Sequence, residues 1–425
     1  MRPLVLGVIA DDVTGATDIA SMLTRCGMDV VQVLGLPAAA DEEVEADALV
    51  VALKTRTVPA AEAVRESLAA ARWLLGRQAR QLFFKYCSTF DSTDAGNIGP
   101  VAEALLDLAG DEITLACPAY PANGRTVYKG HLFVGDRLLS ESGMRHHPLT
   151  PMTDPDLVRV LGRQCRRPQS VGLVPLEVVE AGADAIRAQL ASLRTRGIRL
   201  AVTDATADRH LEALGAAAEG LRLLTGGSGI AMGLPPLYRR AGLLPERSDV
   251  APLPWARGPL AVLAGSCSEA TRAQVAAMAA CHPAIGLDPL ALAEKRQTVA
   301  DVVKAASAAL ASGSVLVHST APADRVADAQ ARLGRERASA LLEEAMGDIA
   351  LGLVAAGVRR LVVAGGETSG RVAQALGVRR LRIGPEIAPG VPWTASLDPP
   401  HLRVAFKSGN FGGEDFFLTA MEADR

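Results

Sequence analysis

Residues 4–15 read LVLGVIADDVTG, and this stretch decides the fold. It opens with an apolar run of strand length, residues 4–9, and ends in two adjacent acids, Asp11 and Asp12. Helix-type periodicity follows over residues 15–25 and stops at a glycine. A buried strand that runs through polar residues into a helix is typical of α/β proteins.

The same alternation recurs along the chain. Further strands are predicted at residues 30–34, 48–53, 82–86, 113–117, 170–175 and 199–203, and helices at 60–75, 98–108 and 178–196. Residues 125–139 interrupt the alternation and predict a β-hairpin excursion. This pattern predicts a mainly parallel sheet with helices on both faces.

A proline-rich segment, residues 244–260, separates this pattern from a second one. Beyond it, strands are predicted at 260–263, 314–318, 360–364 and 402–406, and helices at 269–280, 299–310, 337–356 and 369–376. The sequence therefore predicts two α/β domains, residues 1–245 and 256–425, with mainly parallel sheets. A Pro-rich linker would join them, with a ligand cleft between them.

The composition excludes several classes of protein. Of 425 residues, 49% are hydrophobic and 21% charged, which is typical of globular and not of disordered chains. The net charge of −3 argues against a nucleic-acid binder, and no apolar run is long enough to span a membrane. Six scattered cysteines without a C-x-x-C pair, and an opening run without a signal-peptide cleavage site, favour the cytoplasm.

Polar residues follow three strands of the first domain, at Asp11-Asp12, at residues 54–57 (KTRT) and at residues 85–93 (KYCSTFDST). The two acids suit a general base, a Mg²⁺ ligand or both, although one of them could simply cap the helix. The joint pattern of cations, hydroxyls and carboxylates favours a small polyhydroxylated anion as the ligand. His131, in the hairpin, is either part of a lid or an ordinary loop residue.

Three glycine-rich turns follow strands of the second domain: GSCS at residues 265–268, GGETSG at 365–370 and KSGNFGG at 407–413. A helix N-terminus after such a loop binds anions through its backbone, although Ser266 and Glu269 also have capping-box spacing. Residues 365–370 are not a Walker A motif, because Arg371 and Val372 follow. Three turns together predict a phosphate-rich ligand such as a nucleotide.

Lysine is rare in this chain, with six lysines against 38 arginines. Either the remaining lysines survive by chance, or they are enriched at places where a planar guanidinium would not replace a compact ammonium. Three of them, Lys54, Lys85 and Lys407, lie in the motifs above.

These motifs together resemble the four-carbon acid sugar kinase family over essentially the whole chain. The resemblance rests on IADDVTGA at residues 9–16, DSTDAGN at 91–97, GGET at 365–368 and SGNFG at 408–412. Within the family, residues 85–93, NGRTVY at 123–128 and GHLFVG at 130–135 are similar to the 3-oxo-tetronate kinase branch. The threonate and erythronate kinases tend to carry Leu-Arg where this chain has Asp94-Ala95.

The resemblance implies an N-terminal domain that binds the sugar acid and a C-terminal domain that binds ATP. Family-style ATP contacts carry over onto Ser266, Gly365, Gly366, Glu367, Thr368 and Gly409, with Ser268 and Ser408 as neighbours. The implied reaction is in-line transfer of the γ-phosphoryl group to the 4-hydroxyl of a 3-oxo-tetronate, with Mg²⁺ bridging the phosphates.

Roles for the first-domain residues follow from that reaction. Asp12 would orient or deprotonate the hydroxyl, with Asp11 as support or metal contact. Arg56 and Lys85 would hold the substrate carboxylate, while the oxygens would be read by Ser88, Asp91 and Ser92.

Two alternatives stay open from sequence: a D-threonate or D-erythronate kinase, and a sugar-acid sensor without turnover. A dehydrogenase is disfavoured, because no G-x-G-x-x-G follows the first strand. No nucleic-acid or membrane partner is expected, and a homo-oligomer is left open.

Overall fold

The computed structural model describes residues 4–37, 44–147, 149–246, 253, 256 and 258–422. It divides into two compact units, Met1–Val250 and Ala251–Arg425. The division falls within the Pro-rich segment, of which Pro252 and Pro254 lie outside the described residues.

The first unit contains a parallel sheet with the strand order β2-β3-β1-β4-β11-β5-β10-β9. Its strands are β1 (Leu6–Ala10), β2 (Val30–Leu34), β3 (Ala48–Ala52), β4 (Gln81–Lys85), β5 (Thr114–Cys117), β9 (Val171–Val174), β10 (Leu200–Thr203) and β11 (Leu223–Gly226). The central strands β1, β3 and β4 are buried along their whole length. Such continuous burial is expected of a parallel sheet that is covered on both faces.

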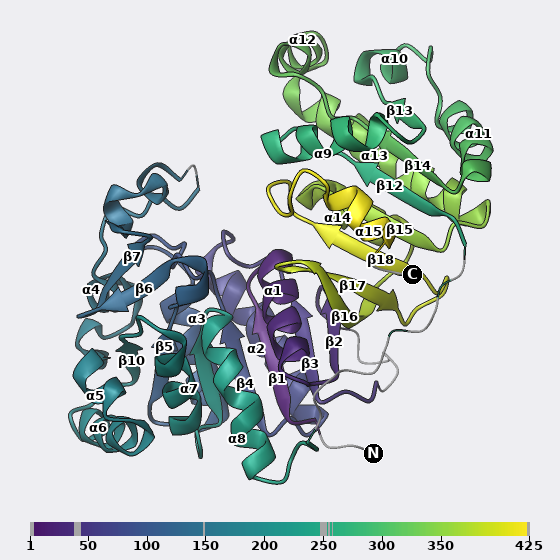
Figure 1. The fold of residues 1–425 in the computed structure, drawn as a ribbon. Coiled ribbons are helices and arrows are strands. Elements are labelled where there is room, and N and C mark those ends of the chain that lie inside the picture. Colours follow the sequence, from purple (N-terminus) through teal and green to yellow (C-terminus); the bar gives the residue numbers. More distant parts are fainter. Residues whose placement is uncertain are drawn as a thin grey trace. The chain divides into compact units, whose positions relative to one another are not determined.

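Helices cover both faces of this sheet. They are α1 (Val13–Arg25), α2 (Ala60–Gly76), α3 (Ile98–Ala109), α4 (Leu157–Gln164), α5 (Leu176–Glu180), α6 (Ala183–Thr195), α7 (Asp208–Ala217) and α8 (Leu234–Arg240). Right-handed crossovers place α1 and α7 on one face and α2 and α3 on the other, and α1, α7 and α8 stand in front of the sheet in Figure 1. The single helix predicted over residues 178–196 is wrong, because Gly182 adopts φ 93° and separates α5 from α6.

The predicted hairpin excursion is confirmed as a small antiparallel sheet of β6 (Arg125–Tyr128), β7 (His131–Val134) and β8 (Arg137–Leu138). One buried carboxylate anchors it. Asp204 accepts hydrogen bonds from the backbone N–H groups of Lys129 (2.7 Å), Gly130 (2.8 Å) and Leu176 (3.0 Å).

The second unit has the strand order β13-β14-β12-β15-β18-β17-β16. Its strands are β12 (Leu260–Ala264), β13 (Ala284–Gly286), β14 (Ser314–His318), β15 (Arg360–Ala364), β16 (Arg380–Ala388), β17 (Val391–Ser396) and β18 (Arg403–Lys407). Neighbouring strands among β13, β14, β12, β15 and β18 pair in parallel. Strand β17 pairs antiparallel with β18 and with β16. The α/β class with mainly parallel sheets is thus confirmed, while β13, β16 and β17 were not predicted.

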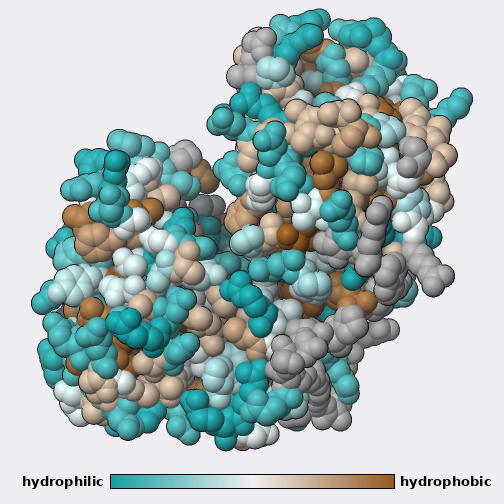
Figure 2. Space-filling model, in the orientation of Figure 1, coloured by the Kyte–Doolittle hydropathy of each residue, from teal (hydrophilic) through white to brown (hydrophobic). Residues whose placement is uncertain are grey.

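The helices of the second unit are α9 (Glu269–Ala279), α10 (Pro289–Ala293), α11 (Val299–Ala309), α12 (Ala323–Leu333), α13 (Arg335–Ala355), α14 (Gly366–Ala375) and α15 (Phe416–Glu422). Among the described residues, none of the helices combines the length and the apolar character needed to cross a membrane. On the face shown in Figure 2, hydrophobic residues form small areas interspersed with hydrophilic ones.

Candidate active site

Four neighbouring strands of the first unit end at the same level. The register places Ala52, Ala10, Lys85 and Gly226 side by side at the carboxyl ends of β3, β1, β4 and β11. The segments that follow these strands therefore meet at one edge of the sheet, which is where ligands bind in open α/β sheets.

Arg56 joins the predicted acids at this edge. Its guanidinium donates to both oxygens of Asp11, at 3.0 and 2.8 Å, and to Oδ1 of Asp12 at 2.7 Å. Oδ2 of Asp91 lies 3.9 Å from Nη1 of the same guanidinium. Arg56 is thus already paired with protein carboxylates.

This ion pair decides the charge of Asp11. Burial raises the pKa of the Asp11 carboxyl above its usual value, and the guanidinium of Arg56 opposes that shift. Burial would lower the pKa of Arg56, but Asp11 and then Asp12 raise it well above its usual range. We conclude that Asp11 and Arg56 depend on each other in this buried position, and that a lost partner would leave a costly buried charge.

Asp12 both caps α1 and faces the site. Its Oδ1 accepts a hydrogen bond from the N–H of Gly15 at 2.9 Å, so the capping interpretation is correct. Its side chain is 29% exposed, against 7% for Asp11. Within the described residues, Oδ2 of Asp12 has neither a hydrogen bond nor an ion pair, in contrast to both oxygens of Asp11 and Asp91. Asp12 is therefore the acid with an oxygen available to a ligand.

Lys85 places a buried ammonium beside Asp12. Its side chain ends β4, and among the described residues Nζ has one acceptor, the carbonyl of Tyr86 at 2.9 Å. A Cβ added to Gly15 would lie 3.0 Å from Nζ of Lys85 and 2.4 Å from Oδ1 of Asp12. Glycine at position 15 thus leaves free the space that both groups face.

Residues 87–93 form a tightly bonded loop. Thr89 donates a short hydrogen bond to Asp91 and lies 2.9 Å from Sγ of Cys87, and burial together with Asp91 raises the pKa of this thiol to about 11. Ser92 accepts from the side-chain amide of Gln164 at 2.9 Å. Ser88 is half-buried, and its hydroxyl has no partner within the part of the chain that the structure describes.

His131 makes its contacts away from these acids. Its Nδ1 lies 2.8 Å from the carbonyl of Lys129, and residue 131 also forms a β-bridge with Asp156. Among the described residues, no hydrogen bond or ion pair joins His131 to the group around Arg56.

Sequence reasoning missed two supporting features of this edge. The side-chain amide of Asn97 donates to the carbonyls of Thr55 (2.7 Å), Arg56 (3.3 Å) and Val58 (2.8 Å), and so fixes the loop that carries Arg56. A glycine-rich turn at residues 226–229 follows β11 next to Lys85, where Ser228 donates a short hydrogen bond to Asp18. The same Gly-Ser signal that identified the second-domain turns could have found this one.

The second unit repeats the arrangement of aligned strand ends. The register places Gly286, His318, Ala264, Ala364 and Lys407 side by side, so that the three predicted glycine turns follow adjacent strands. The structure thus brings the turns at residues 265–268, 365–370 and 407–413 to one edge.

Close approach explains two of these glycines. A Cβ on Gly409 would lie 2.3 Å from Oγ of Ser266, and one on Gly265 would lie 2.0 Å from Oγ1 of Thr368. The Gly409 carbonyl accepts from the hydroxyl groups of Ser268 and Thr271, both at 2.7 Å. Predicted contact residues from all three turns therefore touch one another.

The predicted capping box is displaced by two residues. Ser268, not Ser266, is the N-cap of α9 and accepts from the N–H of Thr271 at 3.2 Å. Ser266 instead accepts from the N–H of Ser268 at 3.2 Å and thereby shapes the turn before the helix.

The turn at residues 365–368 begins α14. Gly365 is its N-cap with φ 119°, a conformation that favours glycine. Gly366 and Glu367 are exposed, and a Cβ on Gly366 would meet no atom within 4 Å. The helix N-terminus is therefore open to an anionic ligand.

The third turn is held by a residue that the sequence did not single out. The side-chain amide of Gln274 donates to the carbonyls of Phe411 (3.0 Å), Gly412 (3.1 Å) and Gly413 (2.9 Å). Ser408, at the start of this turn, is half-buried.

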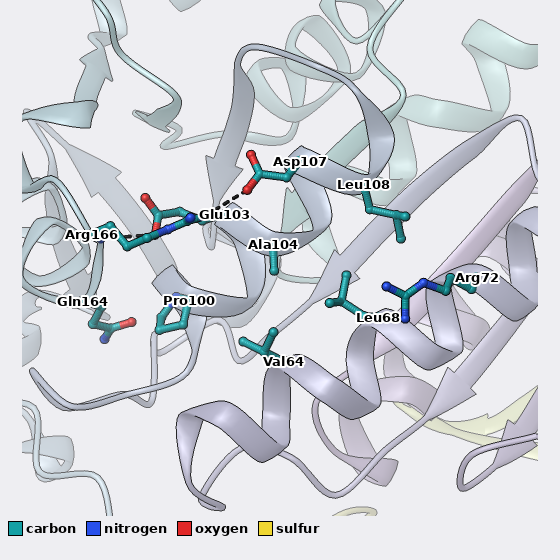
Figure 3. A pocket seen from close by; sticks show the side chains of 10 residues that line it. All are labelled: Val64, Leu68, Arg72, Pro100, Glu103, Ala104, Asp107, Leu108, Gln164 and Arg166. Atoms are coloured by element: carbon teal, nitrogen blue, oxygen red, sulfur yellow. Dashed lines mark hydrogen bonds and ion pairs between the residues drawn. The ribbon is translucent and has the colours of Figure 1, made fainter.

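A hollow of about 580 Å³ between α2 and α3 is a separate feature (Figure 3). Its floor is apolar, and Arg166 pairs on its rim with Glu103 at 3.2 Å and Asp107 at 2.9 Å. None of the predicted site residues lines it. The hollow is therefore not the predicted substrate site.

The described residues hold no group of three or more His, Cys, Asp or Glu side chains that could bind a metal ion.

The chain matches two family models in the order of its two units. Residues 6–234 match a sugar-binding N-terminal domain, and residues 261–417 match a nucleotide-binding C-terminal domain. A Haemophilus influenzae protein of known crystal structure shares the fold with a TM-score of 0.88 and 41% identity, covering 99% of this chain and 100% of that one.

Relatives with names extend over almost the whole chain. A 3-oxo-tetronate kinase of Cupriavidus necator is 58% identical over 99% of this chain and 97% of the relative. A 3-oxo-tetronate kinase of Burkholderia multivorans is 56% identical over the same shares. The sequence, the two matched domains and these relatives agree, and the chain belongs to the four-carbon acid sugar kinase family.

Proposed function

We propose that the chain transfers the γ-phosphoryl group of ATP to the 4-hydroxyl of a 3-oxo-tetronate. The observation that carries the proposal is the free carboxylate oxygen of Asp12 beside the buried ammonium of Lys85. A hydroxy acid needs both: a cation for its carboxylate and a carboxylate for its reacting hydroxyl. The names of the full-length relatives support the choice of the oxo acid.

Asp12 orients the 4-hydroxyl and accepts its proton through Oδ2. Arg56 donates hydrogen bonds to Asp11 and Asp12 and fixes their positions, so it acts as a positioning residue. Because both oxygens of Asp11 are engaged by Arg56, Asp11 supports the site without touching the ligand. The substrate carboxylate goes to Lys85, whose Nζ donates to a single acceptor among the described residues, the carbonyl of Tyr86.

The remaining oxygens of the sugar acid are assigned to Ser88. Asp91 and Ser92 are already bonded to Thr89 and Gln164, and they hold the loop on which Ser88 lies. We assign His131, which lies on the hairpin, to a lid.

ATP is assigned to the turns of the second unit. The backbone N–H groups at the start of α14, from Gly365 to Thr368, suit the phosphates, with Ser266, Ser268, Ser408 and Gly409 shaping the adjoining turns. Mg²⁺ bound with ATP would neutralise negative charge on the phosphates during transfer. We therefore propose the sugar acid and ATP as substrates, Mg²⁺ as the cofactor and the cytoplasm as the location of the enzyme.

The decisive experiment measures ADP release, with Mg²⁺ and ATP, across 3-oxo-tetronates, D- and L-threonate, D-erythronate and D-glycerate. Turnover confined to the oxo acids is expected. Ala95 supports this expectation, since it offers no cation where threonate and erythronate kinases carry Arg. Strong turnover of threonate or erythronate would overturn the substrate assignment, and ATP binding without turnover of any acid would favour a sensor.

A further inference from the structure

Lys407 is a buried cation that neither the predicted site nor the proposed reaction has used. Lys407 is the last residue of β18, at the edge of the sheet where the three glycine turns lie. It is 2% exposed. Burial of an ammonium is costly unless an anion compensates its charge.

The immediate surroundings of Lys407 contain no anion. Nζ lies 3.3 Å from Oγ1 of Thr271 and 3.3 Å from the carbonyl of Gly409. The rings of Phe416 and Phe417 lie 5.7 and 5.8 Å away. Among the described residues, no carboxylate lies within ion-pair distance of Nζ.

We propose that Lys407 is the counter-charge of the bound nucleotide: it positions Gly409 and attracts the phosphates of ATP, so that nucleotide binding favours its protonated form. The proposal rests on the assignment of ATP to these turns. In this proposal Lys407 holds Gly409 in place and attracts the phosphates by its charge. Nucleotide affinity is therefore linked to proton uptake.

Titration supports this linkage. Burial lowers the pKa of Lys407 to about 8, so that its charge is lost near the upper end of the physiological range. Charged groups on the adjoining elements are Glu269 and Arg272 of α9, Glu367 and Arg371 of α14, and Glu414 and Asp415 before α15. None of them contributes to this shift, for which burial is the cause. An anion bound nearby would therefore raise the pKa again.

The first test is calorimetric titration of the wild-type protein with ADP, in two buffers of different ionisation enthalpy. We expect proton uptake on binding at pH 9 and almost none at pH 7. The dissociation constant should rise above pH 8, approaching about tenfold per pH unit if only the charged form binds. Nucleotide binding without proton uptake at pH 9 would overturn the proposal.

The second test uses Lys407→Met, which keeps the length of the side chain and removes its charge. The dissociation constant for ADP should rise about tenfold at pH 7, the size expected for a lost charged contact, and its dependence on pH should flatten. Lys304→Met, at an exposed position of α11 in the same unit, is the control and should change neither. A lower melting temperature with unchanged affinity would show that Lys407 is merely structural.

These binding measurements need no sugar acid, which separates the proposal from the proposed function. Wild-type protein that binds ADP but phosphorylates no acid would contradict the kinase and leave the role of Lys407 standing. Protein that binds no ADP at any pH would overturn both.

Discussion

The two sheet edges hold their charges in opposite ways. At the first edge, Arg56 pairs with Asp11 and Asp12, so the charges of the protein already balance one another. At the second edge, the Thr271 hydroxyl, the Gly409 carbonyl and two phenylalanine rings lie near Lys407, whose charge has no ion-pair partner in the described chain. The comparison teaches that ion pairs preorganise the first edge, whereas at the second edge a buried charge lies among neutral groups of the described chain.

The largest expected effect comes from the exposed acid of the first edge. Asp12→Asn keeps the shape of the side chain and removes the base, so kcat should fall by about 10²- to 10⁴-fold. The affinity for ATP should stay within a factor of about two, since Asp12 belongs to the other edge. Steady-state kinetics with calorimetry checks both values, and near wild-type kcat would remove Asp12 from the mechanism.

Arg56→Met tests whether the first edge depends on its ion pairs. The variant leaves the buried Asp11 without its partner, which should lower the free energy of unfolding by roughly 3–5 kcal/mol. Burial already raises the folded-state pKa of Asp11 above its usual value, and the loss of Arg56 raises it further, so this loss of stability grows as the pH rises above the wild-type pKa of Asp11 and shrinks at lower pH.

Thermal melts between pH 4 and 8 measure this dependence on pH. Adding Asp11→Asn to Arg56→Met removes the unpaired charge and should restore part of the stability. A loss of stability that is independent of pH would contradict the ion-pair account.

Two glycines sharpen the description of the second edge. Gly366→Val should raise the KM for ATP about tenfold without lowering the melting temperature, because its side chain meets only open space until a ligand enters. Gly409→Ala should affect both quantities, because its Cβ would lie 2.3 Å from Oγ of Ser266. An unchanged KM in Gly366→Val would move the phosphates away from this turn.

The smallest expected effect distinguishes two serines of one loop. Ser88→Ala should raise the KM for the sugar acid about fivefold while stability is kept, since only a ligand contact of about 1 kcal/mol is lost. Ser92→Ala removes one of two acceptors of the Gln164 side-chain amide, the other being the carbonyl of Thr93, and should lower the melting temperature instead. Kinetics and melts on both variants reveal whether these roles are reversed.

Periodicity along the chain was enough to predict the parallel strands, because burial on both faces gives them continuous apolar runs. It was not enough for β16, where Arg380, Arg382 and Glu386 interrupt the apolar pattern, nor for the three-residue strand β13. The break between α5 and α6 depends on the conformation of Gly182, which periodicity does not report.

The site could be predicted as a set of segments but not as a set of contacts. Strand ends identify Asp11, Asp12 and Lys85, because neighbouring parallel strands end together. Arg56 pairs with Asp11, which is 45 positions away in the sequence, and with Asp12, which is 44 positions away. No local sequence pattern encodes such contacts. Gln164 and Gln274 escaped notice for the same reason, since each acts on a loop distant in sequence.

The anchoring of the hairpin by Asp204 has a consequence for motion. This carboxylate binds the backbone at Lys129 and Gly130, at the turn between β6 and β7, and also the start of α5. The backbone pairing of Val127 with Ala205 and the hydrogen bonds from Leu132 to Pro155 and from Leu157 to Gly130 add to this anchor. In hydrogen exchange, the hairpin should therefore open as one cooperative unit, separately from the buried parallel sheet, and Asp204→Asn should speed that opening while leaving exchange in β1 unchanged.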